Sequence, residues 1–337
     1  MTTGTATTSR RARFLGEGRI SFRDVALLPP APGNVRVRVH VCALCGSDKR
    51  LLASGSAVVP GHEIAGVVDA VGDRVTLQLG ERVLVYIPVF CGECDQCRRG
   101  QTNRCLQLKD LIGWQRDGGY AEHVDVPARC LLPVPHDIPL DVAVLGLDTV
   151  GTAAHGLRMA LSTQELGVRD LAVIGCGPLG LGVIAVAAAM DLPQPMVYDP
   201  HPDRLATAVT LGGRPIEDLE QLNQADVVVE ASGAEQARKT AQRLVRPGGA
   251  VLALGESNHP YSMAATPRWR RTDCFTIRSF YFPLTEVDQN WDLLRANGAA
   301  LRDQLCVPTL LNDLPSAFQQ FLAGDALKPC ILIPEDS

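Results

Sequence analysis

Residues 35–41 alternate strictly between hydrophobic and polar side chains, in the sequence VRVRVHV. Strict alternation of this kind is typical of a strand with one buried face. Further short runs rich in β-branched residues, among them GVVDAVG, RVLVYIPV and YAEHVDVP, are separated by glycine and proline. The pattern therefore predicts a mostly β structure for roughly the first 140 residues.

The pattern changes near Asp141, where a long apolar helical stretch, VAVLGLDTVGTAAHGLRMAL, begins. Short apolar runs (LAVI, PMVYDP, ADVVVE and GGAVLALG) then alternate with helix-like segments. Short buried strands that alternate with helices predict a parallel, doubly wound sheet. After Phe282 the pattern is mixed, and the last apolar run, LKPCILIP, has no helix left to connect it to that sheet. We therefore expect an α/β fold in which a β-rich domain, formed by both ends of the chain, is interrupted by a second domain.

Size and charge narrow the class of protein. A chain of 337 residues exceeds the usual limit of one hydrophobic core, so two domains are expected. Hydrophobic residues make up 46% of the chain and charged residues 20%, which is ordinary for a globular protein. The net charge of −5 gives no basic surface for nucleic acid or for an anionic membrane, so neither is an expected partner.

The sequence does not predict export or a membrane anchor. The N-terminal stretch MTTGTATTSRRAR lacks the apolar core of a secretory signal. The longest apolar run, residues 179–190, is too short to span a bilayer. The eleven cysteines are odd in number and four of them have metal-binding spacing, which favours a reducing cytoplasm over a disulfide framework.

A glycine-rich turn, GCGPLG, lies between the strand-like run LAVI and a helix-like run. Gly175, Gly177 and Gly180 give it the spacing G-x-G-x-x-G, with Pro178 and Leu179 between the last two glycines. In this context the first glycine allows a tight turn, the second lets the backbone approach a pyrophosphate, and the third lets helix and strand pack closely. The turn predicts dinucleotide binding, and a chance grouping of glycines is the alternative.

Asp199 ends the next predicted strand, 19 residues after Gly180. At about this distance an acidic residue accepts hydrogen bonds from the adenosine ribose. A carboxylate there repels a 2′-phosphate, so NAD is favoured over NADP. Arg204 lies five residues further on and could accommodate such a phosphate.

Two groups of residues have metal-binding character. Cys91, Cys94, Cys97 and Cys105 have the spacing C-x2-C-x2-C-x7-C, which predicts a structural zinc site. A redox or disulfide cluster and a nucleic-acid-binding zinc ribbon are the alternatives. Upstream, Cys45 in CGSD and His62 in GHE form a second group, for which we expect a catalytic zinc.

Several motifs together resemble the zinc-dependent medium-chain dehydrogenase/reductase family, which includes alcohol, sorbitol and threonine dehydrogenases. They are CGSD, PGHEIAGVV, GDRV, CGECDQC, GGYAEHV and VIGCGPLGLG, in the order that the family shows, and the match covers residues 12–334. The resemblance implies a GroES-like catalytic domain at residues 1–147 and 283–337, with a structural zinc lobe at about residues 91–105. It implies a Rossmann NAD-binding domain at residues 148–282.

On that template Cys45 and His62 are ligands of the catalytic zinc. In members that follow the sorbitol dehydrogenase pattern the third ligand is a Glu seven residues before a His, and counting back from His155 places Asp148 there. Asp keeps a carboxylate donor on a shorter side chain. Glu63 is the reserve ligand, and the alternative role for Asp148 is to cap the helix that follows it.

The resemblance also gives supporting roles to neighbours of Cys45. Asp48 would orient the ligand His62, and Ser47 would pass on the proton of the substrate. Family members often carry a His five residues after the ligand Cys to continue this relay, whereas this chain has Arg50. A guanidinium does not exchange protons near neutral pH, so the proton would leave by another route.

Two further positions match cofactor contacts in relatives. Thr152 matches a residue that packs against the nicotinamide, and Lys328 is expected near the cofactor phosphates. Between Leu211 and Asp226 the chain is shorter than is usual in the family, so we expect a helix or turn of the Rossmann domain to be trimmed.

The resemblance implies a zinc-dependent oxidoreductase that transfers a hydride between NAD and a secondary alcohol. The acidic third-ligand position resembles the polyol branch, so the expected substrate is a polyol, sugar or cyclitol. One alternative is a ketone reductase of a biosynthetic pathway that uses NADH or NADPH. Another is an inactive nucleotide-binding homologue with a structural or regulatory role. Relatives are homodimers or homotetramers joined through the edge of the Rossmann sheet, so a homo-oligomer is expected. The two metal-binding groups imply two zinc ions per chain.

Overall fold

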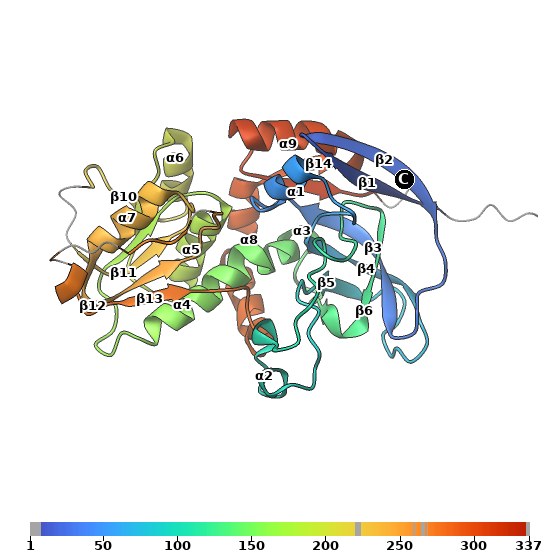
Figure 1. Ribbon diagram of the computed structural model, residues 1–337, viewed down its shortest axis with the longest axis horizontal. Helices are drawn as coiled ribbons and strands as arrows, with labels where there is room; N and C mark the ends of the chain where they lie inside the picture. Colours follow the sequence, from blue (N-terminus) through green and yellow to red (C-terminus); the bar gives the residue numbers. More distant parts are fainter. Residues whose placement is uncertain (1–7, 220–223, 259, 264–266, 268, 335–337) are drawn as a thin grey trace, which may run out of the picture. The chain divides into compact units, whose positions relative to one another are not determined.

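The computed structural model of the protein describes residues 8–219, 224–258, 260–263, 267 and 269–334 (Figure 1). The chain forms two compact units, residues 1–147 with 305–337 and residues 148–304. The second division lies after residue 304, whereas the sequence placed it after residue 282. Helix α8 (Val287–Leu305) accounts for the difference, because the amide nitrogen of its Asn297 side chain donates a 2.9 Å hydrogen bond to the carbonyl oxygen of Ala185 inside the second unit.

The main sheet of the first unit has the strand order β14-β15-β3-β4-β5-β7, and β6 pairs with β3. Strand β3 (Asn34–Ala43) pairs antiparallel with β4 (Glu63–Val71). Val35, Val37 and Val39 in β3 are fully buried, which confirms the strand predicted from the alternation. The other strands and α-helices described before residue 148 are β1 (Thr8–Gly16), β2 (Arg19–Ala26), α1 (Asp48–Ser54), β5 (Arg82–Val85), α2 (Asp95–Arg98), β6 (His123–Pro127), β7 (Leu131–Pro133) and α3 (Leu140–Ala143).

The C-terminal segment returns to the first unit, as the sequence predicts. Strand β15 (Lys328–Leu332) pairs parallel with β14 (Cys306–Leu310) and antiparallel with β3. Ile331 of β15 and Phe318 of α9 (Leu314–Ala323) belong to one apolar core with the valines of β3. Burial of these side chains holds the last strand to the N-terminal part of the chain.

The second unit contains a six-stranded parallel sheet in the order β10-β9-β8-β11-β12-β13. Numbered from the first strand of the unit, this is the order 3-2-1-4-5-6 of the Rossmann fold, which confirms the predicted doubly wound sheet. Its strands are β8 (Leu171–Ile174), β9 (Met196–Tyr198), β10 (Arg214–Pro215), β11 (Ala225–Glu230), β12 (Val245–Ala253) and β13 (Phe275–Arg278). Besides α8, its α-helices are α4 (Ala153–Leu161), α5 (Pro178–Ala189), α6 (Pro202–Thr210) and α7 (Glu235–Leu244).

The connection from β10 to β11 is short. Of the described residues between these strands, 216–219 and 224, none is helical. This agrees with the shortened segment that the sequence shows there. In the described part of the chain, no helix has both the length and the apolar character needed to cross a membrane.

Candidate metal centre and glycine-rich turn

Four cysteines of the first unit form one cluster around α2. The sulfur atoms of Cys91, Cys94, Cys97 and Cys105 all lie within 4.8 Å of one another. The Cys91 and Cys97 sulfurs are 3.8 Å apart, which is about the spacing of two thiolates on a tetrahedral zinc with bonds of about 2.3 Å. All eleven cysteines lie in the described part of the chain and none of them forms a disulfide, so these four thiols are available as metal ligands.

Backbone amides already favour thiolates in this cluster. The N–H groups of Glu93 and Cys94 donate to the Cys91 sulfur at 3.4 and 3.3 Å, and they lower the pKa of that thiol. N–H groups of Cys97 and Leu106 lower the pKa of Cys94 to about 6. Burial has the opposite effect on Cys97 and raises its pKa to about 12. A cation would favour the charged form of all four thiols.

The second metal-binding group lies where β3 ends and β4 begins. These strands pair in the register Ala43 with Glu63, so Cys45 after β3 lies near His62 before β4. One donor atom each from Cys45, His62, Glu63 and Asp148 lies within 4.8 Å of the other three. Sulfur, imidazole and carboxylate donors form a set that zinc binds.

Asp48 fixes the geometry around His62. Its Oδ1 atom lies 3.1 Å from Nδ1 of His62, which leaves Nε2 as the ring nitrogen for a metal. Its Oδ2 atom accepts hydrogen bonds from the Tyr120 hydroxyl at 2.7 Å and from the Cys45 N–H at 3.1 Å. Burial, reinforced by the Asp48 charge, raises the pKa of Tyr120, so its hydroxyl stays a donor. Tyr120 lies in the motif GGYAEHV, but nothing local in that motif indicates this contact.

Glu63 is paired with Lys328 from the C-terminal strand. The Lys328 Nζ atom lies 2.7 Å from Oε1 of Glu63, and the two side chains are 2% and 0% exposed. The Lys328 ammonium group therefore neutralises a buried carboxylate that belongs to the metal-binding group itself. This placement differs from the phosphate contact that the sequence predicted for Lys328.

Ser47 and Trp114 also adjoin this group. The Ser47 hydroxyl donates to the Cys45 sulfur at 3.3 Å, just before α1 begins. The centre of the Trp114 ring lies 5.9 Å from the centre of the His62 ring. The Cζ atom of Arg50 lies over the same Trp114 ring, 4.9 Å from its centre. Trp114 carries no sequence motif of its own and was missed by the sequence analysis.

Asp148 and Thr152 begin and end a short π-helix that precedes α4. Asp148 is bonded to Leu147 and is the first residue of the second unit. Helix α4 continues directly from this π-helix, because Thr152 has helical φ and ψ angles of −65° and −41°, so Asp148 lies at the start of the whole helical stretch and its alternative role as a helix cap stays a prediction.

The glycine-rich turn follows β8 and leads into α5. Gly175 has a φ of +99°, and a Cβ atom at Gly180 would lie 1.9 Å from the carbonyl oxygen of Gly175. Around Gly177, by contrast, a Cβ would meet nothing within 4 Å. Gly175 and Gly180 thus meet the steric demands of the turn, and the open backbone at Gly177 can be approached by a phosphate group. Pro178 and Leu179 begin α5.

Asp199 lies directly beside this turn. Its Oδ2 atom accepts a 2.7 Å hydrogen bond from the N–H of Cys176, and its Oδ1 atom accepts one of 2.9 Å from the N–H of His201. Burial, together with the Asp199 charge, raises the pKa of Cys176 to about 12, and the Arg204 charge opposes this effect. Asp199 and Arg204, which the sequence predicts at the adenosine end of the cofactor, therefore both lie close to the glycine-rich turn.

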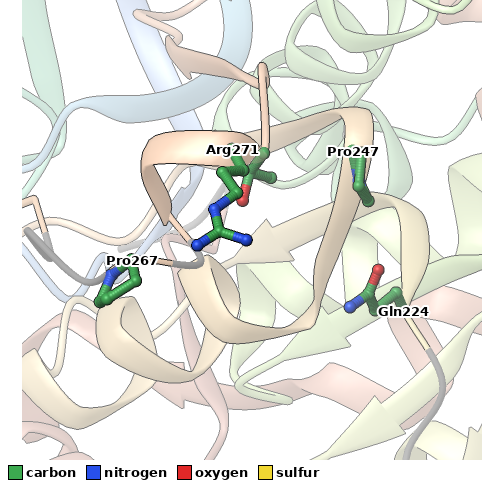
Figure 2. A pocket seen from close by; sticks show the side chains of 5 residues that line it. Gln224, Pro247, Pro267 and Arg271 are labelled. Carbon is green, nitrogen blue, oxygen red and sulfur yellow. The ribbon is translucent and has the colours of Figure 1, made fainter.

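A separate pocket of about 400 Å³ lies elsewhere in the second unit and is lined by Gln224, Pro247, Pro267, Arg271 and Thr272 (Figure 2). Gln224 directly precedes β11, so this pocket is at the amino ends of the strands. Ligands of doubly wound sheets bind at the carboxyl ends, where the glycine-rich turn lies. None of the predicted site residues lines this pocket.

The chain is similar to known dehydrogenases along most of its length. Residues 31–136 match the family described as alcohol dehydrogenase GroES-like domain. An L-threonine 3-dehydrogenase of Rhizobium rhizogenes is 33% identical over 245 residues, which cover 66% of this chain and 69% of that protein. A sorbitol dehydrogenase of Arabidopsis thaliana is 29% identical over 281 residues, 76% of each chain. The structure of an alcohol dehydrogenase from Thermus sp. ATN1 matches with a TM-score of 0.87 at 28% identity, over 96% of this chain and 100% of that one.

Proposed function

Because the chain belongs to the zinc-dependent medium-chain dehydrogenase/reductase family, we propose that it is an oxidoreductase that transfers a hydride between a secondary alcohol and NAD. The observation that carries this proposal is the group of donor atoms from Cys45, His62, Glu63 and Asp148. The relatives are named for threonine, an amino acid, and for sorbitol, a neutral polyol, and both of these compounds carry a secondary hydroxyl group. A polyol, sugar or cyclitol is the substrate class that the acidic residue at position 148 favours.

Cys45, His62 and Asp148 would hold the catalytic zinc, with Glu63 in reserve. When bound, zinc supplies a Lewis acid that lowers the pKa of a substrate hydroxyl. Asp48 keeps the His62 ring in one orientation, and Lys328 keeps the charge of Glu63 balanced. The four cysteines at positions 91, 94, 97 and 105 would hold a second, structural zinc.

Ser47 would accept the hydroxyl proton of the substrate at its Oγ atom. The hydroxyl lies next to Cys45 and can donate and accept hydrogen bonds at once, as a relay requires. Arg50 cannot take the proton further, because its guanidinium stays charged. The proton would therefore pass from Ser47 to water or to a ribose hydroxyl.

The glycine-rich turn would bind the pyrophosphate of NAD, which supplies the hydride acceptor. Gly177 would allow the close approach, and the N-terminus of α5 would add its partial positive charge. Asp199 would accept hydrogen bonds from the adenosine ribose and disfavour a 2′-phosphate, with Arg204 nearby. Thr152 would pack against the nicotinamide.

We further infer a homo-oligomer located in the cytoplasm. The eleven free thiols suit a reducing compartment. A dimer or tetramer would join through β13, one of the two edge strands of the Rossmann sheet.

Metal analysis combined with activity tests this proposal. The purified protein should carry two zinc ions per chain, and dilute 1,10-phenanthroline should remove one of them together with the activity. Asp148→Ala should retain one zinc and Asp148→Glu two, whereas the control Asp141→Ala should retain two and full activity. If protein with both zinc ions reduces no NAD with any member of a panel of polyols, cyclitols and simple secondary alcohols, the proposed function is wrong.

A further inference from the structure

The pocket near the amino ends of β11 and β12 has no part in the proposed reaction. Its volume of about 400 Å³ lies within the range of about 300–1,000 Å³ that is usual for small-molecule sites. The described residues that line it are two prolines, a glutamine, a threonine and an arginine: Pro247, Pro267, Gln224, Thr272 and Arg271. Among these lining residues, Arg271 is the only one with a charge.

Backbone hydrogen bonds hold the walls of this pocket together. The N–H of Gly248 in β12 donates to the carbonyl oxygens of Thr272 and Asp273 at 3.0 and 3.2 Å. The N–H of Thr272 donates to the carbonyl oxygen of Trp269 at 3.1 Å and closes the turn that contains Arg271. The segment that carries Arg271 is therefore fixed to the start of β12. A ligand that enters a preformed site loses less binding free energy to ordering the protein.

The Arg271 guanidinium has no hydrogen bond or ion pair with another residue in the described part of the chain. Arg246, which also lies close to the pocket, is instead engaged in an ion pair with the buried Asp226. Figure 2 shows the guanidinium of Arg271 in the space between Pro267 and Gln224. Its N–H donors can therefore reach a ligand inside the pocket.

Acidic residues adjoin the pocket but do not line it. They are Glu165, Asp170, Asp226 and Asp273. The Asp226 carboxylate accepts hydrogen bonds from two backbone N–H groups, at 2.6 and 2.9 Å, and pairs with Arg246. The other three are exposed, where water and salt screen their charges. Arg270 is also exposed and adds positive charge next to Arg271, so the pocket favours an anion.

The lining residues define the chemistry of the ligand. A guanidinium offers a planar fork of N–H donors that matches a carboxylate or a phosphate. The side-chain amide of Gln224 adds a donor and an acceptor for further polar groups of the ligand. The rings of Pro247 and Pro267 offer apolar surfaces to its hydrocarbon part. This combination fits a small organic molecule with one anionic group and a compact apolar part, whereas a cation would be repelled by Arg271.

We propose that this pocket binds a small organic anion, a carboxylate or a phosphate ester, through Arg271. The pocket is separate from the glycine-rich turn, because the six residues of β11 lie between them. Gln224 precedes that strand, whereas Ser232, which packs closely against Gly175 of the turn, follows it. A strand of six residues spans about 20 Å. The pocket is therefore a second ligand site in the second unit, and it does not depend on the proposed hydride transfer.

Fluorine NMR on protein labelled with 5-fluorotryptophan tests the proposal, because the three tryptophans of the chain lie in different places. Trp269 begins the turn that contains Arg271, Trp114 lies beside His62, and Trp291 lies in α8. Replacing each tryptophan in turn with phenylalanine assigns the three signals. With NADH in excess to occupy the cofactor site, phenyl phosphate or benzoate should shift the Trp269 signal to saturation and leave the Trp114 signal in place.

The choice of compounds identifies the anionic group. Phenyl phosphate and benzoate share an apolar ring, so a difference between their dissociation constants shows whether the site prefers a phosphate or a carboxylate. Inorganic phosphate should bind more weakly than phenyl phosphate, because it has no apolar part to contact the prolines. If none of the three compounds shifts the Trp269 signal of the wild type, the proposal is wrong.

Arg271→Gln should raise the dissociation constant of the bound compound by about 10- to 100-fold, as expected for loss of a charge-assisted, bidentate contact. Arg270→Gln is the matched control, since it removes an exposed positive charge from the adjacent residue, which does not line the pocket. Its dissociation constant should be that of the wild type. Equal weakening in both variants would overturn the site, because it would indicate only the general charge of this surface. Binding is measured without turnover, so these results stand whether or not the protein oxidises an alcohol.

Discussion

At the scale of single residues, the metal-binding group depends on buried charges that are paired. Asp48 is fully buried, and its two oxygens face His62, Tyr120 and the backbone of Cys45. A buried carboxylate is stable only when its oxygens have such partners. The same contacts involve two of the proposed zinc ligands, His62 and Cys45, so Asp48 would position both.

Replacing Asp48 with Asn tests this role. Asn keeps the size of the side chain but removes the charge that faces His62, so affinity for the second zinc should fall by about 10- to 100-fold. Competition with a chromophoric chelator measures this affinity, and the zinc held by the four cysteines serves as the internal control. Equal affinity in the variant and the wild type would show that Asp48 does not position the ligand.

The buried pair of Lys328 and Glu63 gives a second prediction at this scale. Lys328→Met removes the ammonium group that neutralises the buried Glu63 carboxylate. The uncompensated charge should lower the free energy of unfolding by about 3–5 kcal/mol. Urea unfolding followed by intrinsic fluorescence measures the change. The double variant Glu63→Gln, Lys328→Met should recover most of the loss, because no uncompensated charge remains.

The exposed pair of Lys239 and Glu235 is the matched control. Its Nζ and Oε1 atoms are also 2.7 Å apart, but the side chains are 55% and 63% exposed. Lys239→Met should therefore lower the free energy of unfolding by less than about 1 kcal/mol. If Lys239→Met and Lys328→Met lower the free energy of unfolding by similar amounts, burial of the Lys328–Glu63 pair does not determine the cost of losing the lysine.

Sequence reasoning identified the residues of the candidate metal site that lie in short motifs but not the partners that stabilise them. Cys45, Asp48 and His62 stand next to diagnostic neighbours, and the structure brings all three together. Lys328 is separated from Glu63 by 265 positions, and their pairing depends on β15 returning beside β3. A contact set by the packing of distant strands leaves no local pattern in the sequence.

At the scale of secondary-structure elements, Glu286 connects the start of α8 to α4. Its Oε1 atom lies 2.8 Å from Nδ1 of His155, and its Oε2 atom accepts a 2.5 Å hydrogen bond from Arg158. Burial alone would raise the pKa of Glu286, but His155 and Arg158 outweigh it, and the pKa lies below its usual value. The ionised form of Glu286 is thus favoured by folding.

This shift predicts how stability depends on pH. A carboxyl group with a lowered folded-state pKa contributes stability above its unfolded value of about 4.3, and the contribution is lost as pH falls through the folded-state value. Glu286→Gln should cost about 1 kcal/mol or less at pH 7, because the pair is partly exposed and screened. The difference in thermal midpoint between Glu286→Gln and wild type should shrink between pH 5 and about pH 3. A difference that stays constant over that range would refute the assigned role of ionised Glu286.

The elements also show which parts of the fold the sequence could specify. The parallel sheet was predictable because its strands are short apolar runs between helices, and β8 meets the glycine-rich turn directly. The position of α8 was not, because its pattern is mixed and its polar contacts with the rest of the second unit join residues far apart in the sequence, Asn297 with the backbone of α5 and Asn290 with Arg158 of α4. Such contacts follow from tertiary packing and not from periodicity.

At the scale of the whole molecule, the edges of the two sheets decide how copies of the chain could associate. Strand β13 ends the Rossmann sheet, and Phe275 in it and Phe280 just after it are 49% and 46% exposed. Strand β14 ends the sheet of the first unit, but it contains Pro308, a residue that makes an edge strand a poorer partner. Exposed aromatic side chains on an unblocked edge favour β13 as the contact between subunits.

A charge placed on this edge should therefore separate the subunits. Phe275→Lys puts an ammonium group where an apolar side chain would be buried between copies, so the variant should sediment as a monomer of 36.1 kDa while the wild type sediments as a multiple of that mass. Val307→Lys makes the same change on β14, where Val307 is 37% exposed, and should leave the mass of the oligomer unchanged. Sedimentation velocity on all three proteins measures the outcome. If Val307→Lys dissociates the oligomer and Phe275→Lys does not, the subunits meet through the sheet of the first unit, because an inserted charge disrupts only the edge that is buried in the assembly.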